Sequence, residues 1–78
     1  MPTVHQARGY RFFLFTNGPK GEPRIHVEQD HRYAKFTLQP IALERLLGFG
    51  DQQVAEIRKI LEEHRGMFLM KWDEYVGR

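Results

Sequence analysis

The chain of 78 residues contains no cysteine and no long apolar run. Without cysteine it can form neither a disulfide nor a thiolate zinc site, and its composition fits a reducing compartment. No apolar stretch approaches the roughly 20 residues that span a bilayer, and the amino terminus lacks the apolar core of a signal peptide. These absences predict a cytoplasmic protein without membrane attachment.

Several arrangements that carry chemistry are also missing. No Ser/His/Asp or Cys/His pattern stands out, and the glycines of residues 17–23 precede no helix that would bind a phosphate. The three histidines of the first half lack the His-x-His or i, i+4 spacing typical of a metal site. We therefore expect no catalytic residue, no metal and no cofactor.

Size and charge set the remaining limits. A chain of this length is one domain, residues 1–78, and six Phe, three Tyr and one Trp supply its packing. Residues 1–39 carry six Lys or Arg and three Asp or Glu, whereas residues 40–78 carry six and seven. The basic excess of the first half favours an anionic partner such as a nucleic acid or an acidic protein.

The first half of the chain predicts antiparallel strands. Residues 3–5 indicate a short edge strand. Residues 10–16 have the strongest strand pattern, because they are rich in aromatic residues and too short for a buried helix. Both faces of that strand are apolar, so we expect both to be covered. Residues 17–23, with two glycines and two prolines, predict a hairpin loop.

Residues 23–28 and 33–38 predict a second hairpin, with its turn centred on Asp30 and His31. Alternation of apolar and polar residues determines its register, because a slip of one residue would mix the two faces. The predicted pairs are Val27 with Ala34, His26 with Lys35, Ile25 with Phe36 and Arg24 with Thr37.

The polar face of this hairpin carries the candidate contact residues. His26 lies opposite Lys35, and a cation at that distance disfavours protonation of the imidazole. Arg24 and Tyr33 share the face, and the aromatic strand adds rings beside it. Basic and aromatic side chains on a sheet face are typical of single-stranded nucleic-acid binding. We interpret these four residues as contacts for a nucleic acid or another anion; ordinary polar positions on a solvated face are the alternative.

The second half predicts two helices. Pro40 suits a first helical position, the apolar residues of 41–47 follow, and Gly48 ends the helix. Asp51 predicts the N-cap of a second helix, whose apolar residues recur at steps of three and four. A continuous helix over residues 52–76 would be about 37 Å long, against about 30 Å for a compact domain of this size. Either Gly66 breaks it, or its far end overhangs.

These elements predict an α+β fold. A small antiparallel sheet of three to four strands, over about residues 3–38, carries two C-terminal helices over about residues 40–76, packed on one face. The expected core consists of Phe12 or Phe13, Ile25, Val27, Phe36, Leu38, Leu43, Leu46, Val54, Ile57, Leu61 and Phe68.

The assembled motifs resemble a bacterial family known as domain of unknown function 4160. The resemblance rests on the order and spacing of its pieces, which run nearly from end to end. They are residues 1–4 (MPTV), 9–13 (GYRFF), the Pro-x-x-His-Val segment at 23–27, residues 34–36 (AKF), Gly48-Phe49 and the closing Trp72-x-Glu74-Tyr75. Members often have a second histidine where this chain has Arg24. The resemblance implies a small partner-dependent protein, often encoded in a gene pair like a toxin–antitoxin pair.

Two functional hypotheses follow. The first is a non-enzymatic protein-interaction module of a toxin–antitoxin-like pair, which binds a small partner protein or forms a homodimer. Its interface would be the exposed sheet face or the helix end that carries Trp72 and Tyr75. The second is a protein that binds RNA or DNA, or an RNA-cleaving toxin, acting through the basic sheet face around His26 and Lys35.

Overall fold

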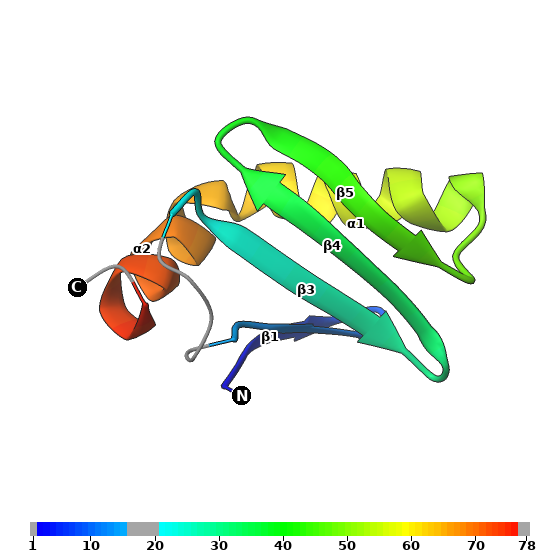
Figure 1. Cartoon of the computed structure of the whole chain (residues 1–78). Coiled ribbons are helices and arrows are strands. Elements are labelled where there is room, and N and C mark those ends of the chain that lie inside the picture. The colour runs from blue at the N-terminus through cyan, green and yellow to red at the C-terminus, as the bar shows by residue number, and fades with distance from the viewer. Residues whose placement is uncertain (1, 16–20, 77–78) are drawn as a thin grey trace.

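The computed structural model describes residues 2–15 and 21–76, and in this part of the chain an α+β fold is confirmed. Five strands form one antiparallel sheet in sequence order, and two helices follow them (Figure 1). The strands are β1 (Thr3–Ala7), β2 (Tyr10–Phe13), β3 (Arg24–Gln29), β4 (Arg32–Leu38) and β5 (Ile41–Leu47); the helices are α1 (Asp51–Glu63) and α2 (Arg65–Tyr75). The sheet is thus larger than the predicted three to four strands.

The first hairpin joins β1 and β2. The predicted edge strand forms and extends to Ala7, and the chain reverses through Arg8 and Gly9, whose φ values of 53° and 86° are left-handed. β2 ends at Phe13, earlier than predicted, and residues 14 and 15 lie beyond the strand, although the Leu14 N–H still donates to the Pro2 carbonyl at 3.2 Å. Thr16 and residues 17–20 of the predicted loop lie outside the described residues.

The register of the second hairpin is confirmed in every predicted pair. β3 and β4 pair Arg24 with Thr37, Ile25 with Phe36, His26 with Lys35 and Val27 with Ala34. Asp30, with φ of 55°, makes the turn, as a short polar side chain tolerates the left-handed region. The alternation of the sequence is therefore sufficient to determine which residues share each face.

The predicted helix over residues 40–47 is wrong, because this segment is the fifth strand. Gln39 and Pro40 form the tight connection from β4, and the Thr37 hydroxyl donates to the Pro40 carbonyl. A bulge explains the error: Phe36 pairs with Leu43 while Lys35 pairs with Arg45, which leaves one extra residue in β5. Because of this extra residue, Leu43 and Leu46 lie on the same face of the strand although they are three positions apart. A spacing of three is also typical of a helix, and this explains the wrong prediction.

Both C-terminal helices come from the single helix predicted over residues 52–76. α1 begins after Gly50, whose backbone N–H donates to the Gln53 side chain at 3.1 Å, so Asp51 is the first helical residue and not the N-cap. The break falls at His64, two residues before Gly66, and a hydrogen bond of 2.9 Å from Arg65 Nε to the Leu38 carbonyl joins α2 to the sheet. Neither predicted alternative, a break at Gly66 or an overhanging helix, is correct.

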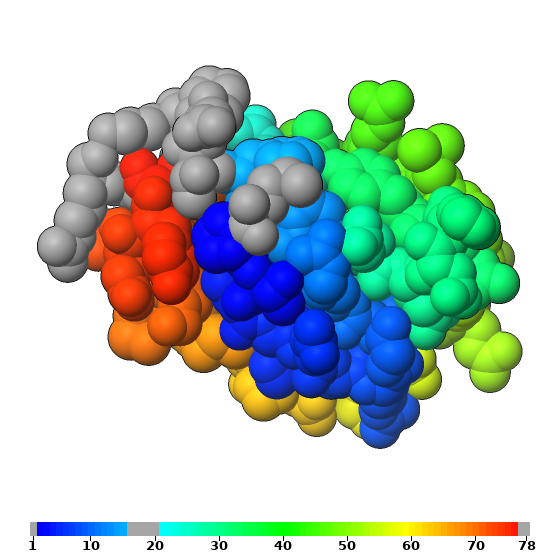
Figure 2. Space-filling model, turned by 90° about the horizontal axis from the view of Figure 1, so that it is seen from below, coloured from blue at the N-terminus to red at the C-terminus, as the bar shows by residue number. Residues whose placement is uncertain are grey.

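The helices cover one face of the sheet and enclose the core. Phe12, rather than Phe13, belongs to this core, where its ring lies 5.4 Å from that of Phe68. The other predicted core positions are buried or half-buried, except Leu46, which is 38% exposed because it lies at the sheet edge. Figure 2 shows the first strands lying beside α2. No helix in residues 2–15 and 21–76 has the length and apolar character to cross a membrane.

Candidate binding site on the uncovered sheet face

The face of the sheet opposite the helices carries a row of aromatic and basic side chains. Cross-strand pairing sets Phe13 beside His26, His26 beside Lys35, and Lys35 beside Arg45, across β2, β3, β4 and β5. The next row along the strands brings Tyr33 beside Leu47. Because these side chains alternate with those of the core, they all point away from the helices.

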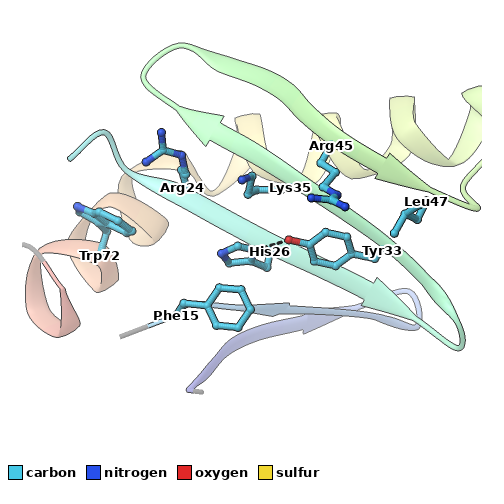
Figure 3. Close-up of a pocket in the computed structure, with 8 residues that line it drawn as sticks. All are labelled: Phe15, Arg24, His26, Tyr33, Lys35, Arg45, Leu47 and Trp72. Carbon is cyan, nitrogen blue, oxygen red and sulfur yellow. Dashed lines mark hydrogen bonds between the residues drawn. The ribbon is translucent and has the colours of Figure 1, made fainter. Parts of the chain in front are cut away.

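A pocket of about 590 Å³ opens on this face. Its lining falls into two groups (Figure 3). Three cationic side chains, Arg24, Lys35 and Arg45, lie in a line over β3, β4 and β5. The other side is formed by the rings of Phe15, His26, Tyr33 and Trp72, with Leu47 at one end. The pocket therefore has a cationic wall and an aromatic wall.

His26 forms the floor of the pocket and is only 6% exposed. The Phe15 ring covers it at a centroid distance of 4.1 Å, and Phe13 stacks on it at 5.4 Å. Burial is the main reason that the pKa of His26 falls to about 4; Lys35 and Arg24 lower it further, while Glu44 opposes them. The imidazole is therefore neutral at physiological pH.

Tyr33 orients this ring through a hydrogen bond of 2.7 Å between its hydroxyl and His26 Nδ1. Burial raises the pKa of Tyr33, so the phenol keeps its proton. The hydroxyl can donate to Nδ1, and in that tautomer the proton of the neutral ring is on Nε2. The free ring nitrogen of His26 points toward Trp72 in Figure 3, which makes it a hydrogen-bonding group inside the pocket.

The cations of this face share few acidic partners. Arg11 pairs with Glu28 at 2.7 Å, and both lie outside the pocket lining. Glu44 binds Arg24 at 2.9 Å and lies 3.8 Å from the Lys35 ammonium, so one carboxylate serves two cations. Arg45 has no acidic partner within 4 Å among residues 2–15 and 21–76. The cationic wall thus retains an excess of about two positive charges, a local field that attracts anions.

The four predicted contact residues, Arg24, His26, Tyr33 and Lys35, all line this one pocket. The two predicted interface residues of the last helix differ in exposure and in position relative to the pocket. Trp72 is 9% exposed, belongs to the core and closes one end of the pocket, whereas Tyr75 is 46% exposed and is not part of the lining.

Arg45 and Leu47 are site residues that sequence reasoning missed. Both lie on β5, which was read as a helix, so no pairing with β4 was considered. Phe15 was predicted only as one of several aromatics of its strand. No local pattern marks this strand, because residues 41–43 are all apolar and the bulge at Glu44 depends on the pairing with β4.

The remaining histidines do not join this site. His5 lies against His64, with ring centroids 4.8 Å apart, on the helix-covered side near Phe68, and His31 is exposed in the β3–β4 turn. Burial and the nearby His64 lower the pKa of His5. Within residues 2–15 and 21–76, no three His, Cys, Asp or Glu side chains are placed to hold a metal ion.

Comparison with known proteins agrees with the sequence motifs. The family model described as "Domain of unknown function (DUF4160)" matches residues 9–73, so the chain belongs to this family. No curated protein and no solved structure matches the chain. The family assignment therefore leaves the biochemical role to be argued from the site.

Proposed function

We propose that the protein is a non-enzymatic binding module whose ligand is single-stranded nucleic acid, RNA in the first instance. The observation that carries this proposal is the pocket itself, in which three cations face four aromatic rings on an uncovered sheet surface. Cationic side chains bind the phosphates of a single strand, and aromatic rings stack on its bases. Both kinds of group occur here at one place.

A binding role is favoured over RNA cleavage by the state of His26. A general base works best with a pKa near the operating pH, whereas His26 has a pKa of about 4. Its Nδ1 is also engaged by Tyr33, and the Phe15 ring covers the imidazole. These features suit a group that orients a ligand by hydrogen bonding more than one that removes a proton from it.

The test is a proton–nitrogen NMR titration with a short mixed-sequence RNA at moderate salt, comparing the unmodified chain with two variants. Lys35→Gln removes a pocket cation, and Lys59→Gln removes an exposed cation on α1, beyond the opposite face. Shifts should cluster on Arg24, His26 and Lys35. Lys35→Gln should weaken binding about tenfold, the size of one charge-assisted hydrogen bond, and Lys59→Gln should leave it unchanged. An unshifted spectrum, or equal effects of the two variants, would refute the proposal.

A protein partner in a toxin–antitoxin-like pair is the second candidate, and a separate feature favours it. β5 is an edge strand, and its Leu46 and Leu47 are 38% and 54% exposed. Such an edge can accept a strand from another chain. Coexpression with the product of the adjacent gene, followed by size-exclusion chromatography, tests this: the two proteins should co-elute, and Leu46→Lys should separate them. Separate elution of the unmodified pair would exclude this candidate.

The interface predicted at Trp72 and Tyr75 stays a prediction, but Trp72 is a poor position at which to test it. An exposed tryptophan on an overhanging helix would be a natural interface anchor. Trp72 is instead packed in the core, so its truncation would destabilise the fold by about 3–5 kcal/mol and could not report on binding alone. Experiments on partner binding should therefore use exposed positions such as Leu46.

A further inference from the structure

We infer that the pocket on the uncovered face is a mononucleotide site, which takes one base and one phosphate together. This inference rests on the proposed function, since it names the ligand unit that the same face would bind. It also predicts that a free nucleoside monophosphate binds to the pocket. A flat nucleic-acid-binding surface would not be expected to bind a single free nucleotide.

The two walls of the pocket are arranged for such a ligand. Figure 3 shows Lys35 and Arg45 side by side on one wall, with the rings of Phe15 and Tyr33 on the other. A phosphate alone would use only the cations, and a nucleoside alone only the rings. A nucleoside monophosphate uses both at once, because its flat base and its anion lie at opposite ends.

Charge and size agree with this ligand. Three cations, two of which share Glu44, leave about two positive charges, and a phosphate monoester carries about −1.5 to −2 at neutral pH. The pocket volume of about 590 Å³ lies within the range of roughly 300–1,000 Å³ typical of small-molecule sites. Both quantities fit one nucleotide.

Arg45 is the principal phosphate ligand in this arrangement. Within residues 2–15 and 21–76 it is the pocket cation without an acidic partner, whereas Glu44 already engages Arg24 and Lys35. A guanidinium can also bind two phosphate oxygens at once. His26 adds a neutral ring nitrogen inside the pocket, and Phe15, at 41% exposure, offers a ring on which a base can stack.

The experiment is a set of NMR titrations of the unmodified chain at low salt with adenosine 5′-monophosphate, adenosine and inorganic phosphate. Adenosine 5′-monophosphate should bind at least about tenfold more tightly than either part, with shifts at Arg24, His26, Tyr33 and Arg45. Arg45→Gln should weaken the binding of adenosine 5′-monophosphate about tenfold. Lys59→Gln, which removes a cation from α1, should leave this binding unchanged. If inorganic phosphate binds as tightly as the nucleotide, the pocket is a simple anion site and the inference is overturned. If adenosine binds as tightly as the nucleotide, the phosphate contributes nothing and the inference is overturned as well.

A parallel titration with a short adenine oligonucleotide separates this inference from the proposed function. If the oligonucleotide binds and the mononucleotide does not, the inference fails while nucleic-acid binding stands. If the mononucleotide binds and the oligonucleotide does not, the pocket is a free-nucleotide site and the proposed function fails. If both bind and affinity rises with chain length, the pocket holds one nucleotide of a strand.

Discussion

His26 is a buried ring on the face of the sheet that the helices leave uncovered. Phe13 and Phe15 pack against it, and the Tyr33 hydroxyl bonds its Nδ1. Two nearby cations add to the effect of burial, so the protonated ring is disfavoured for two independent reasons. The residue therefore couples the stability of this face to pH.

The sign of that coupling follows from the two pKa values. In the unfolded chain the imidazole has a pKa of 6.5, and in the folded protein about 4, so the unfolded state binds the proton more tightly. The contribution of neutral His26 to the free energy of unfolding is complete above pH 6.5. It is lost as the pH falls towards 4, and the total loss is roughly 3 kcal/mol. Urea unfolding between about pH 7 and about pH 4 should show this decline.

The variant His26→Asn isolates the effect, because His5 also has a lowered pKa and acts in the same direction. The difference in unfolding free energy between the unmodified chain and His26→Asn should shrink as the pH falls. His31→Asn, in an exposed turn, serves as the matched control. A difference that does not change with pH would contradict the assignment of His26 as a buried neutral ring.

At this scale the sequence predicted the neighbour of His26 but not its burial. The pairing with Lys35 follows directly from the register. The contact with Tyr33 is diagonal, since Tyr33 pairs with Glu28, and Phe15 reaches the ring from beyond the end of β2. Diagonal contacts and residues outside regular pairing depend on strand twist, which alternation alone does not specify.

At the scale of elements, β5 and its connection to α1 supply the part of the site that is hardest to predict. The bulge at Glu44 directs Glu44 to Arg24 while Arg45 stays on the uncovered face beside Lys35. The hydrophobic spacing of this strand is helical in appearance because the bulge adds one residue. Local patterns therefore determined β3 and β4, but β5 required knowledge of its partner strand.

Gly48 makes the sharp turn from β5 towards α1. Its φ of +89° lies in the left-handed region, and a Cβ there would come within 3.1 Å of the Arg32 side chain. Gly48→Ala should therefore lower the free energy of unfolding by about 1–2 kcal/mol. Gly50→Ala is the matched control, because its φ is −82° and a Cβ at Gly50 would meet nothing within 4 Å. Denaturant unfolding of both variants measures the difference, and equal losses would refute the role of Gly48.

At the scale of the molecule, the break at His64 determines what the helices can cover. It lets α2 pack beside the first strands, as Figure 2 shows, so that Phe68 and Trp72 complete the core. Helix length compared with domain size left two alternatives, a break at Gly66 or an overhanging end, and the break lies instead at His64, with Gly66 inside α2. Since both helices lie on one face, neither of them covers the basic residues of the other face.

This distribution of charge makes a quantitative prediction about salt. If Arg24, Lys35 and Arg45 each contact one phosphate, log K for a single strand should fall against log salt with a slope of about −2. Raising salt from about 50 to about 200 mM should then weaken RNA binding roughly 20-fold. Fluorescence anisotropy with a labelled oligonucleotide, repeated over this range, measures the slope.

Removing one pocket cation should change that slope by a defined amount. Arg45→Gln should make it shallower by about 0.7, the contribution of one phosphate contact on a single strand. Lys59→Gln removes the same charge from the opposite side of the molecule and should preserve the slope. If both variants reduced the slope equally, binding would follow net charge alone. The pocket on the uncovered face would then not be the binding site, because binding depends on the position of a charge only when that charge contacts the ligand directly.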